Sequence, residues 1–414
     1  MNSCIGAGPS SSPDLNTMAS DAEASSPGSV SFDFMPRTRL VFGVNAVERV
    51  GELAAELSAK RVLLVTDPGI VSAGHAGRVI QLLERQNLKV VCFDQVEENP
   101  STHCVERCVD VARLLNIDTI VGLGGGSSMD TAKGCNFILT NGGQMKDYWG
   151  IGKAKLPMLP LIAIPTTGGT GSECQSFALI TDNQTHQKMA CGDPKAAARI
   201  AILDPALTLS QPPQVTACSG IDAIAHAVET AVTKRRTPFS SLFSREAFRL
   251  TVAGLPRVLA APGDVDARGK MLLGAALAGI AIENSMLGAA HSAANPLTAH
   301  FGTAHGKAVG LMLPHIVRFN SSDALSAQVY RDLALVAGIC SSSDAPDVAS
   351  EKLAGHLEGL LDLARLPRSL TDCGAHNGDL TRLAEEACGQ WTAQFNPRTL
   401  TTEDFRGLYA RALS

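Results

Sequence analysis

The sequence predicts an α/β part followed by an all-helical part. Between residues 60 and 205, short β-branched runs alternate with amphipathic stretches, the order of elements found in a parallel sheet covered by helices. After the segment LSQPPQ at 209–214 the strand pattern stops, and helical periodicity continues to the end, broken at Pro, Gly and Ser/Asp clusters. We therefore expect residues 31–210 to form an α/β domain and residues 211–414 a helical domain.

The expected strands are apolar, β-branched runs bounded by turn residues. They are RVLLVTD (61–67), LKVVCFD (88–94), IDTIVGLGGG (117–126, a strand and its loop), MLPLIAIPTT (158–167) and ARIAILDP (198–205). Helices are expected between the first strands at 74–87 and 102–116. In the second half they are expected at 215–234, 240–260, 266–290, 306–319, 325–338, 346–365, 379–393 and 402–413.

Composition excludes several classes of partner. The 414 residues are 45% hydrophobic and 18% charged, with a net charge of −5, which is typical of a soluble globular protein without a basic footprint for nucleic acid. No run of about 18 apolar residues predicts a membrane span. The first 30 residues are rich in Ser, Ala, Gly and Pro and contain no Lys or Arg, so we expect a disordered tail without a secretory or mitochondrial address.

The eleven cysteines are dispersed through mostly apolar sequence. This pattern is typical of reduced thiols and favours a cytoplasmic protein. Cys104 and Cys108 have a spacing that metal ligands use, but no second pair at zinc spacing follows, so we expect them to be structural.

A glycine loop follows the third expected strand and opens a helix, in VGLGGGSSMDTAKG at 121–134. Backbone N–H groups and the helix dipole at such a position bind phosphate; the alternative is a structural turn.

Asp67 ends the first strand, where a carboxylate would accept hydrogen bonds from a ribose and repel a 2′-phosphate, favouring NAD over NADP. The alternative is an Asp that begins the turn at Pro68-Gly69. Because Asp67 precedes the glycines, the sheet must be connected differently from the common dinucleotide fold.

The stretch SGIDAIAHAVE (219–229) places Asp222 and His226 four residues apart on a predicted helix, within reach of one ion. The alternative is a capping box from Ser219 to Asp222, with His226 a core histidine. Downstream, His291, His300 and His305 occur within fifteen residues. Two histidines from this separate hairpin would complete a set of three nitrogens and one carboxylate, which suits Zn²⁺ or Fe²⁺ better than Ca²⁺ or Mg²⁺. Such an ion lowers the pKa of an alcohol and promotes hydride departure.

Four ordered motifs, GGGSSMDTAK, IPTTGGTGSE (164–173), GIDAIAHAVE and AHSAANPLTAHFGTAHG, together with NPRTLTTEDF near the end, resemble the iron-containing (group III) alcohol dehydrogenase family from about residue 32 onward. The resemblance implies an α/β dinucleotide-binding domain and a helical domain with the metal in the cleft between them. It implies metal binding by Asp222, His226, His291 and His305. It further implies cofactor binding by Asp67, Asn99, Gly125, Gly126, Ser127, Thr166, Thr167, Thr170 and Lys188.

One position departs from the family pattern. Many relatives carry a proton-relaying histidine four residues after the third ligand, where this chain has Asn295. Because an amide does not titrate near neutral pH, a relay would use His300, water or the cofactor ribose.

The expected activity is hydride transfer between NAD(H) and a small primary alcohol or aldehyde, assisted by one divalent metal, Fe²⁺ or alternatively Zn²⁺. The alternatives are a related dehydrogenase for a hydroxy acid or polyol, a dehydroquinate-synthase-like lyase, and a protein that keeps the fold without turnover. The family resemblance also implies a homo-oligomer, expected as a dimer.

Overall fold

The computed structural model describes residues 31–185 and 187–413. Residues 34–414 form one compact unit, which contains both the α/β and the helical parts. The tail expected at residues 1–30 lies outside the described residues.

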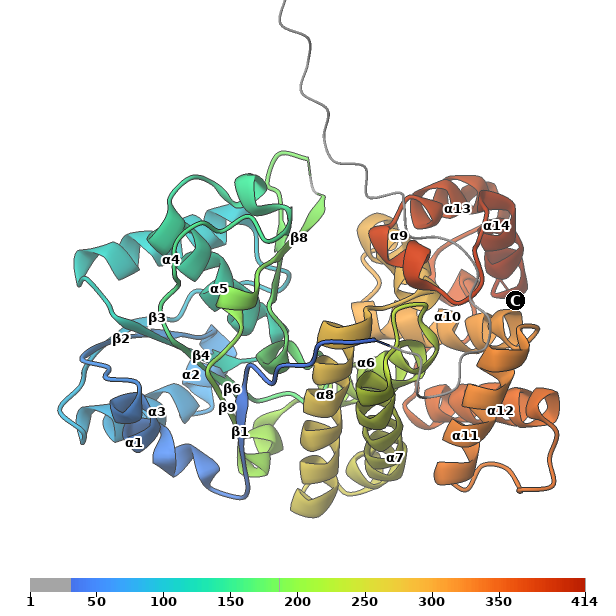
Figure 1. Ribbon diagram of the computed structural model, residues 1–414, viewed down its shortest axis with the longest axis horizontal. Coiled ribbons are helices and arrows are strands. Elements are labelled where there is room, and N and C mark those ends of the chain that lie inside the picture. The colour runs from blue at the N-terminus through green and yellow to red at the C-terminus, as the bar shows by residue number, and fades with distance from the viewer. Residues whose placement is uncertain (1–30, 186, 414) are drawn as a thin grey trace, which may run out of the picture. The chain divides into compact units, whose positions relative to one another are not determined.

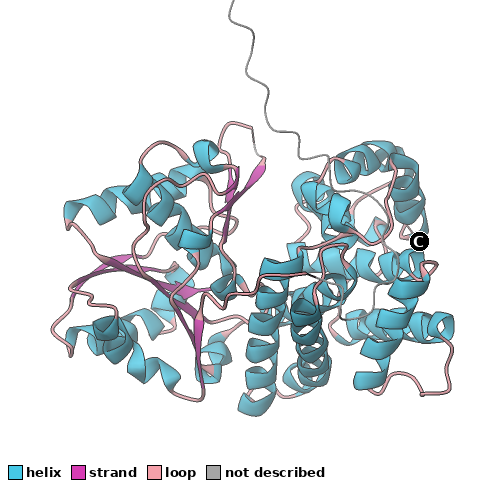
Figure 2. Cartoon of the chain, in the orientation of Figure 1, coloured by secondary structure: helices cyan, strands magenta, loops and turns pink. Residues whose placement is uncertain are grey.

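A six-stranded parallel sheet forms the centre of the α/β part (Figures 1 and 2). Its strand order is β1-β9-β6-β4-β2-β3, and each neighbouring pair is parallel. The five expected strands are confirmed with shorter bounds, as β2 (Arg61–Val65), β3 (Lys89–Phe93), β4 (Thr119–Gly124), β6 (Leu161–Pro165) and β9 (Ile200–Leu203). The edge strand β1 (Arg39–Phe42) was not predicted.

The strand order reverses between β2 and β4. The chain leaves β2 for β3 on one side, then returns to β4 on the other side of β2 and continues outward through β6 and β9. In open parallel sheets, ligands bind beyond the carboxyl ends of the strands at such a reversal. The two strands that meet here carry Asp67 and the glycine loop at those ends, which explains why the acid precedes the glycines in the sequence.

A second sheet of three strands was missed by the sequence analysis. It consists of β5 (Gly150–Ile151), β7 (Phe177–Thr181) and β8 (Lys188–Gly192), with β7 and β8 antiparallel and β5 parallel to β8. Strand β5 has only two residues and β8 carries no β-branched residue, so the structure of this sheet depends on pairing between its strands more than on local pattern.

The helices of the α/β part cover the six-stranded sheet. They are α1 (Val50–Glu56), α2 (Pro68–Ser72), α3 (His75–Glu84), α4 (Thr102–Leu114) and α5 (Gly126–Asn141). The buried positions of α4 and α5 pack on one face of the sheet and those of α1 and α3 on the other, in two separate apolar clusters. The connections of this part contain the short 3-10 helices η1 (Ala46–Arg49), η2 (Met145–Tyr148), η3 (Ser172–Cys174) and η4 (Pro194–Ala196).

The second part is helical, as expected (Figure 1). After η5 (Pro205–Ser210) it contains α6 (Pro213–Val232), α7 (Pro238–Ala260), α8 (Val265–Ser285), α9 (Ala289–Phe301), α10 (His305–Asn320), α11 (Ala324–Val336), α12 (Pro346–Leu363), α13 (Leu380–Cys388) and α14 (Thr402–Arg411). The 3-10 helix η8 (Trp391–Phe395) includes residues expected at the end of the helix at 379–393.

The expectation for residues 286–305 was wrong. The helix expected at 266–290 ends at Ser285, where Met286 follows with φ of 69°, and the segment expected as a hairpin is the helix α9. Pro296 lies inside α9, and a proline normally interrupts a helix. Packing compensates, since the apolar side chains along α9, including Leu297, are buried in the helical core.

Among the described residues, no single helix is long and apolar enough to cross a membrane. The pair α8 and α9 meets that criterion jointly by length and composition, with a bend of 106° between them.

Candidate metal centre and nucleotide site

Helix α6 carries three polar side chains inside the core, Asp222, His226 and Glu229, which are 5%, 5% and 3% exposed. Their spacing of four and then three residues places them on one face of the helix. Ser219 lies in the interior of α6, which begins at Pro213. The alternative of a capping box from Ser219 is therefore excluded, and burial of the three side chains needs another explanation.

The histidines from three helices converge on one carboxylate oxygen. Asp222 Oδ1 lies 3.6 Å from Nε2 of His226 on α6, 3.5 Å from Nε2 of His291 on α9, and 3.9 Å from Nε2 of His305 at the start of α10. The rings of His226 and His291 stack with their centroids 4.8 Å apart, and the ring of His305 lies 5.3 Å from that of His291. One ligand atom from each of Asp222, His226 and His291 lies within 4.8 Å of the others.

Two atoms of this cluster have no hydrogen-bond partner although they are buried, Asp222 Oδ1 and His291 Nε2. A buried polar atom without a partner costs about 1–3 kcal/mol. The two atoms lie 3.5 Å apart, and a divalent cation bound to both would satisfy both of them at once. The donors are three imidazole nitrogens and one carboxylate oxygen, which fit Fe²⁺ or Zn²⁺.

The other ring nitrogens of His226 and His291 are held by the protein, so that the Nε2 of each faces the cluster. His226 Nδ1 lies 3.3 Å from the carbonyl oxygen of Gly169, in the loop after β6. His291 Nδ1 forms a short hydrogen bond with Glu229 Oε2, and Glu229 Oε1 accepts a 2.6 Å hydrogen bond from the N–H of Ala290. Such outer partners fix the orientation of metal-binding imidazoles.

Glu229 is a functional candidate that the sequence analysis missed. The signal was present, because Glu229 lies seven residues after Asp222 in the quoted motif and so on the same helix face. A glutamate near the end of an amphipathic helix is usually solvent-exposed, however, and only the packing of α9 against α6 shows that this one is buried against His291.

The charges in the cluster are distributed unevenly. Burial would raise the pKa of Asp222, but the neighbouring histidines hold it below its usual range. Burial lowers the pKa of His226, and it lowers the pKa of His305 to about 3. Burial also opposes a charge on His291, yet Glu229 and Asp222 raise its pKa to about 9. At neutral pH, His226 and His305 are therefore neutral and available as ligands, whereas His291 carries a proton that a bound cation would displace.

The glycine loop lies at the carboxyl end of β4 and at the start of α5. Gly124 has φ of 144°, and a Cβ there would come 2.4 Å from Ser128 Oγ, so a side chain would not fit. Gly125 is the N-cap of α5 and forms no side-chain cap. The first N–H groups of α5 are thus presented without a competing side chain, as a phosphate-binding helix terminus requires.

The other expected nucleotide residues lie around this helix terminus. The N–H of Thr166 donates a 2.9 Å hydrogen bond to the carbonyl of Gly124. Thr167 lies beside Gly125 and Thr170 beside Gly126, where an added Cβ would come within 3.5 Å and 2.8 Å of the respective threonine methyl carbons. The structure therefore brings the loop after β6 against the loop after β4.

Asn99, Ser127 and Lys188 also meet at this edge. The N–H of Asn99 donates to Ser127 Oγ over 3.3 Å, and Lys188 Nζ donates to Asn99 Oδ1 over 3.2 Å. Asn99 has φ of 52°, in the left-handed region. These three residues come from the connection between β3 and α4, the start of α5 and strand β8, and no spacing rule connects them.

Asp67 has two roles in the structure. Its Oδ1 accepts a 3.1 Å hydrogen bond from the N–H of Ile70 and caps α2, as the turn interpretation expects. Its Oδ2 lies 3.5 Å from Ser128 Oγ, beside the glycine loop. The turn and nucleotide interpretations are therefore compatible.

His300 is not brought to the metal cluster. It lies nine residues after His291 on α9, roughly two and a half turns, and so faces the opposite side of the helix. Its Nε2 lies 2.8 Å from both carboxylate oxygens of Glu386 on α13. In this structure His300 therefore contacts Glu386, and no hydrogen bond or ion pair among the described residues joins it to the metal cluster. Asn295 lies one turn after His291, and its Nδ2 donates to Gln390 Oε1 over 2.9 Å.

The cysteine pair at residues 104 and 108 forms no second metal site. Both thiols are buried along α4 in the core of the α/β part. Within the described residues, the group formed by Asp222, His226 and His291 is the one cluster with metal-binding geometry, and the ten described cysteines form no disulfide.

The α/β part has a doubly wound sheet with a loop of the phosphate-binding type, and the helical part has a buried cluster of three histidines and one aspartate. Together these features define a class of metal-dependent oxidoreductases. Comparison with known proteins gives the family. The model for iron-containing alcohol dehydrogenase matches residues 36–205, and the model for the C-terminal part of the Fe-containing alcohol dehydrogenase family matches residues 216–413. The chain belongs to the iron-containing alcohol dehydrogenase family.

Relatives match over nearly the whole chain. The NAD-dependent methanol dehydrogenase of Bacillus methanolicus is 33% identical over 373 residues, covering 90% of this chain and 97% of that protein. Choline dehydrogenase of Bacillus subtilis (strain 168) is 34% identical over 380 residues, covering 91% and 94%. The solved structure of an alcohol dehydrogenase from Oenococcus oeni has a TM-score of 0.89 at 30% identity, covering 92% of this chain and 100% of that one.

Proposed function

We propose that this protein transfers a hydride between NAD(H) and a small primary alcohol or its aldehyde, with one divalent metal, Fe²⁺ or Zn²⁺. The observation that carries the proposal is the convergence of three imidazole Nε2 atoms on the unpartnered Oδ1 of Asp222. Two relatives with 33% and 34% identity are named for methanol and choline. Both of those substrates are primary alcohols, which supports the substrate class.

The cation would be held by Asp222, His226, His291 and His305. When bound, it would lower the pKa of a substrate hydroxyl and thereby favour departure of hydride from the adjacent carbon. Glu229 and the Gly169 carbonyl orient two of the imidazoles, so the ligand atoms need little reorganisation when the cation enters.

The proton released from the alcohol needs a path that does not use a histidine of α9. Asn295 cannot titrate, and His300 faces Glu386 on the other side of the helix. We propose that the proton leaves through water or the cofactor ribose.

The nucleotide would lie at the reversal between β2 and β4. Gly125, Gly126 and Ser127 would donate to the pyrophosphate from the start of α5. Thr166, Thr167 and Thr170, together with Asn99 and Lys188, would line the cofactor. We propose that residues 31–210 act as the NAD-binding domain and residues 211–414 as the metal-binding domain. The loop after β6 connects the two functions, because its Gly169 contacts His226.

The test of the function combines metal analysis with turnover. The protein is purified anaerobically, its Fe and Zn are measured, and NADH oxidation is followed with a panel of short aldehydes before and after chelation. We expect near one Fe or Zn per chain and turnover that chelation abolishes and metal addition restores. Turnover that persists in fully metal-free protein would overturn the proposal.

Replacing Asp67 with glycine is expected to raise the use of NADP relative to NAD. The carboxylate beside the glycine loop repels a 2′-phosphate and accepts hydrogen bonds from a ribose, so its loss removes discrimination of roughly 1–3 kcal/mol, or about 5- to 150-fold in the ratio of kcat/KM values. Because Asp67 also caps α2, Asp67→Ser serves as a control that restores a cap without the charge. If the preference for NAD over NADP is unchanged in both variants, Asp67 only caps the turn and does not select the cofactor.

We also propose a cytoplasmic homodimer. The ten described cysteines are free, as expected in a reducing compartment. Strand β1 is at the edge of the six-stranded sheet and pairs only with β9 among the described strands, which leaves one side available for a second copy. Sedimentation of the protein as a monomer at micromolar concentration would contradict the dimer.

A further inference from the structure

Gly288 lies at the junction between α8 and α9, directly before the helix that carries His291. It is buried and is the N-cap residue of α9. Its φ of −127° is one that any residue adopts, so the backbone conformation does not require a glycine here. The surrounding atoms do require one, because a Cβ on Gly288 would lie 3.1 Å from Glu229 Oε1 and 3.2 Å from Asn396 Oδ1. Both distances are tighter than most contacts that Cβ atoms make in proteins.

The carboxylate of Glu229 has little freedom to move away from such a Cβ. Its Oε2 is hydrogen-bonded to His291 Nδ1, and its Oε1 accepts a 2.6 Å hydrogen bond from the N–H of Ala290. Glu229 is also 3% exposed, so no solvent-filled space is open to it. A shift of the carboxylate would therefore alter the hydrogen bond that orients the ring of His291.

The side chain of Asn396 is held in place from the other direction. Its Nδ2 donates to Asn320 Oδ1 and to the carbonyl oxygen of Arg398, both over 2.8 Å. Asn320 Nδ2 donates in turn to Asn396 Oδ1 over 3.1 Å and to the hydroxyl of Tyr330 over 3.2 Å. Asn320, Tyr330 and Asn396 are each 1% exposed. Because a satisfied polar network in a core fixes its side chains, Asn396 would not yield to a methyl group at position 288.

A shift of the backbone at Gly288 would disturb the same contacts. The carbonyl oxygen of Gly288 accepts hydrogen bonds from the N–H of Ser292 over 3.3 Å and from Ser292 Oγ over 3.0 Å. These bonds close the first turn of α9, which contains Ala290 and His291. Movement of Gly288 would therefore carry both of these residues away from Glu229.

We propose that Gly288 is a positioning residue of the metal centre. Its lack of a side chain lets Glu229 remain in contact with both His291 and Ala290 while Asn396 fills the other side of the junction. Gly288 contacts neither the metal nor the substrate and acts through Glu229 alone. The inference rests on the metal site proposed above and adds a requirement for glycine at the start of α9.

The test is a double-mutant cycle between positions 288 and 229, with the affinity of the metal-free full chain for Zn²⁺ as the readout. The dissociation constant is obtained by competition with a chromophoric chelator. We expect Gly288→Ala to weaken Zn²⁺ binding about 10-fold, as the loss of an outer partner of a metal-binding histidine does. In the Glu229→Ala background, the same change is expected to alter the affinity less than about twofold, because no carboxylate remains to be displaced.

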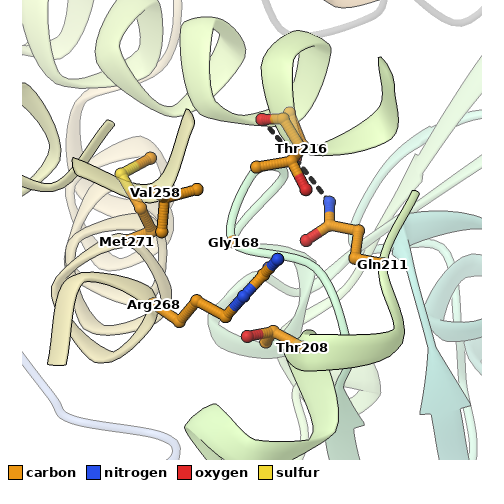
Figure 3. A pocket seen from close by; sticks show the side chains of 8 residues that line it. Gly168, Thr208, Gln211, Thr216, Val258, Arg268 and Met271 are labelled. Atoms are coloured by element: carbon orange, nitrogen blue, oxygen red, sulfur yellow. Dashed lines mark hydrogen bonds between the residues drawn. The ribbon is translucent and has the colours of Figure 1, made fainter. Parts of the chain in front are cut away.

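Two control variants separate this effect from a general disturbance of the helical part. Gly359→Ala makes the same chemical change on α12, where an added Cβ would meet no atom of another element within 4 Å among the described residues. Thr216→Val changes a buried residue of α6 that borders a cavity of about 10 Å³ (Figure 3). The Oγ1 of Thr216 has no hydrogen bond within the described part of the chain, so none is lost. Both controls are expected to keep the Zn²⁺ affinity of the unaltered protein.

Each outcome of the cycle decides the proposal. A loss of Zn²⁺ affinity confined to Gly288→Ala in the presence of Glu229 supports it. Unchanged affinity in Gly288→Ala, an equal loss in both backgrounds, or a similar loss in the controls would overturn it. If Gly288→Ala alone does not fold, recovery of folding in the double variant with Glu229→Ala supports the proposal, and failure of the double variant to fold contradicts it.

The readout also separates this proposal from the proposed function, because Zn²⁺ affinity is measured without turnover. A chain that binds Zn²⁺ with the expected pattern of affinities but turns over no alcohol or aldehyde would contradict the proposed function and support the role of Gly288. Absence of Zn²⁺ binding in the unaltered chain would overturn both.

Discussion

Replacing His226 with alanine is expected to lower turnover by roughly 10³-fold or more, because a Lewis-acid cation supplies several kcal/mol of stabilisation to the developing alkoxide. His226 is 5% exposed and contributes one of the nitrogens that face Asp222 Oδ1. Its removal leaves a buried carboxylate with fewer positive neighbours and an incomplete ligand set. We expect the purified variant to contain less than a tenth of the metal found in the unaltered protein.

His300→Ala is the matched control for this experiment. Both residues are histidines on core helices, but His300 pairs with Glu386 away from the cluster. We expect His300→Ala to keep its metal and to change turnover less than twofold. Circular dichroism of both variants checks that the fold is retained. Normal metal content and turnover in His226→Ala would contradict the proposed ligand set. A large loss of turnover in His300→Ala would indicate that His300 acts as a proton relay.

Replacing Glu229 with alanine is expected to weaken metal binding about 10- to 100-fold. Glu229 is 3% exposed, hydrogen-bonded to His291 Nδ1, and also accepts from the N–H of Ala290. Without it, His291 is free to rotate and to change the nitrogen that carries its proton. The measurement is the metal dissociation constant, obtained by competition with a chromophoric chelator.

A conservative variant distinguishes positioning from a merely structural role. Glu229→Gln keeps a carbonyl oxygen that accepts from His291 and is expected to bind metal more tightly than Glu229→Ala. The rise in Tm on metal addition gives a second readout. A structural role would lower the Tm of metal-free and metal-loaded protein equally, whereas a positioning role lowers the rise itself. Equal metal affinity in Glu229→Ala and the unaltered protein would exclude the positioning role.

The strands that were predicted are those whose own composition requires burial. The runs around Leu64, Val121 and Ile162 are apolar on both faces, and these side chains are fully buried in the parallel sheet. Strands β1, β5, β7 and β8 were not predicted because they lie at the edge of the large sheet or in the small sheet, and because β5 has only two residues and β8 begins with the polar Lys188. Such segments become strands only when a partner strand is present.

Helix α9 shows how tertiary packing can override a local signal. Pro296 and the adjacent polar residues predict a break in the sequence pattern. In the structure, Ala290, Ala293, Ala294 and Leu297 are fully buried in the helical core, and this burial outweighs the hydrogen bond that proline omits. The helical structure of this segment also determines which histidine reaches the cluster. On the helix, His291 and His300 point to opposite sides, and only His291 faces Asp222.

The sequence by itself determined the fold class, the glycine loop at the start of a helix, and the pair formed by Asp222 and His226, because each depends on short-range periodicity. The resemblance already named His291 and His305 beside that pair, and the tertiary structure placed their Nε2 atoms near Asp222 Oδ1 and Glu229 against His291. It also brought Asp67, Asn99 and Lys188 to the same end of the sheet. These features unite residues from elements far apart in the chain, and only packing sets the distances between them.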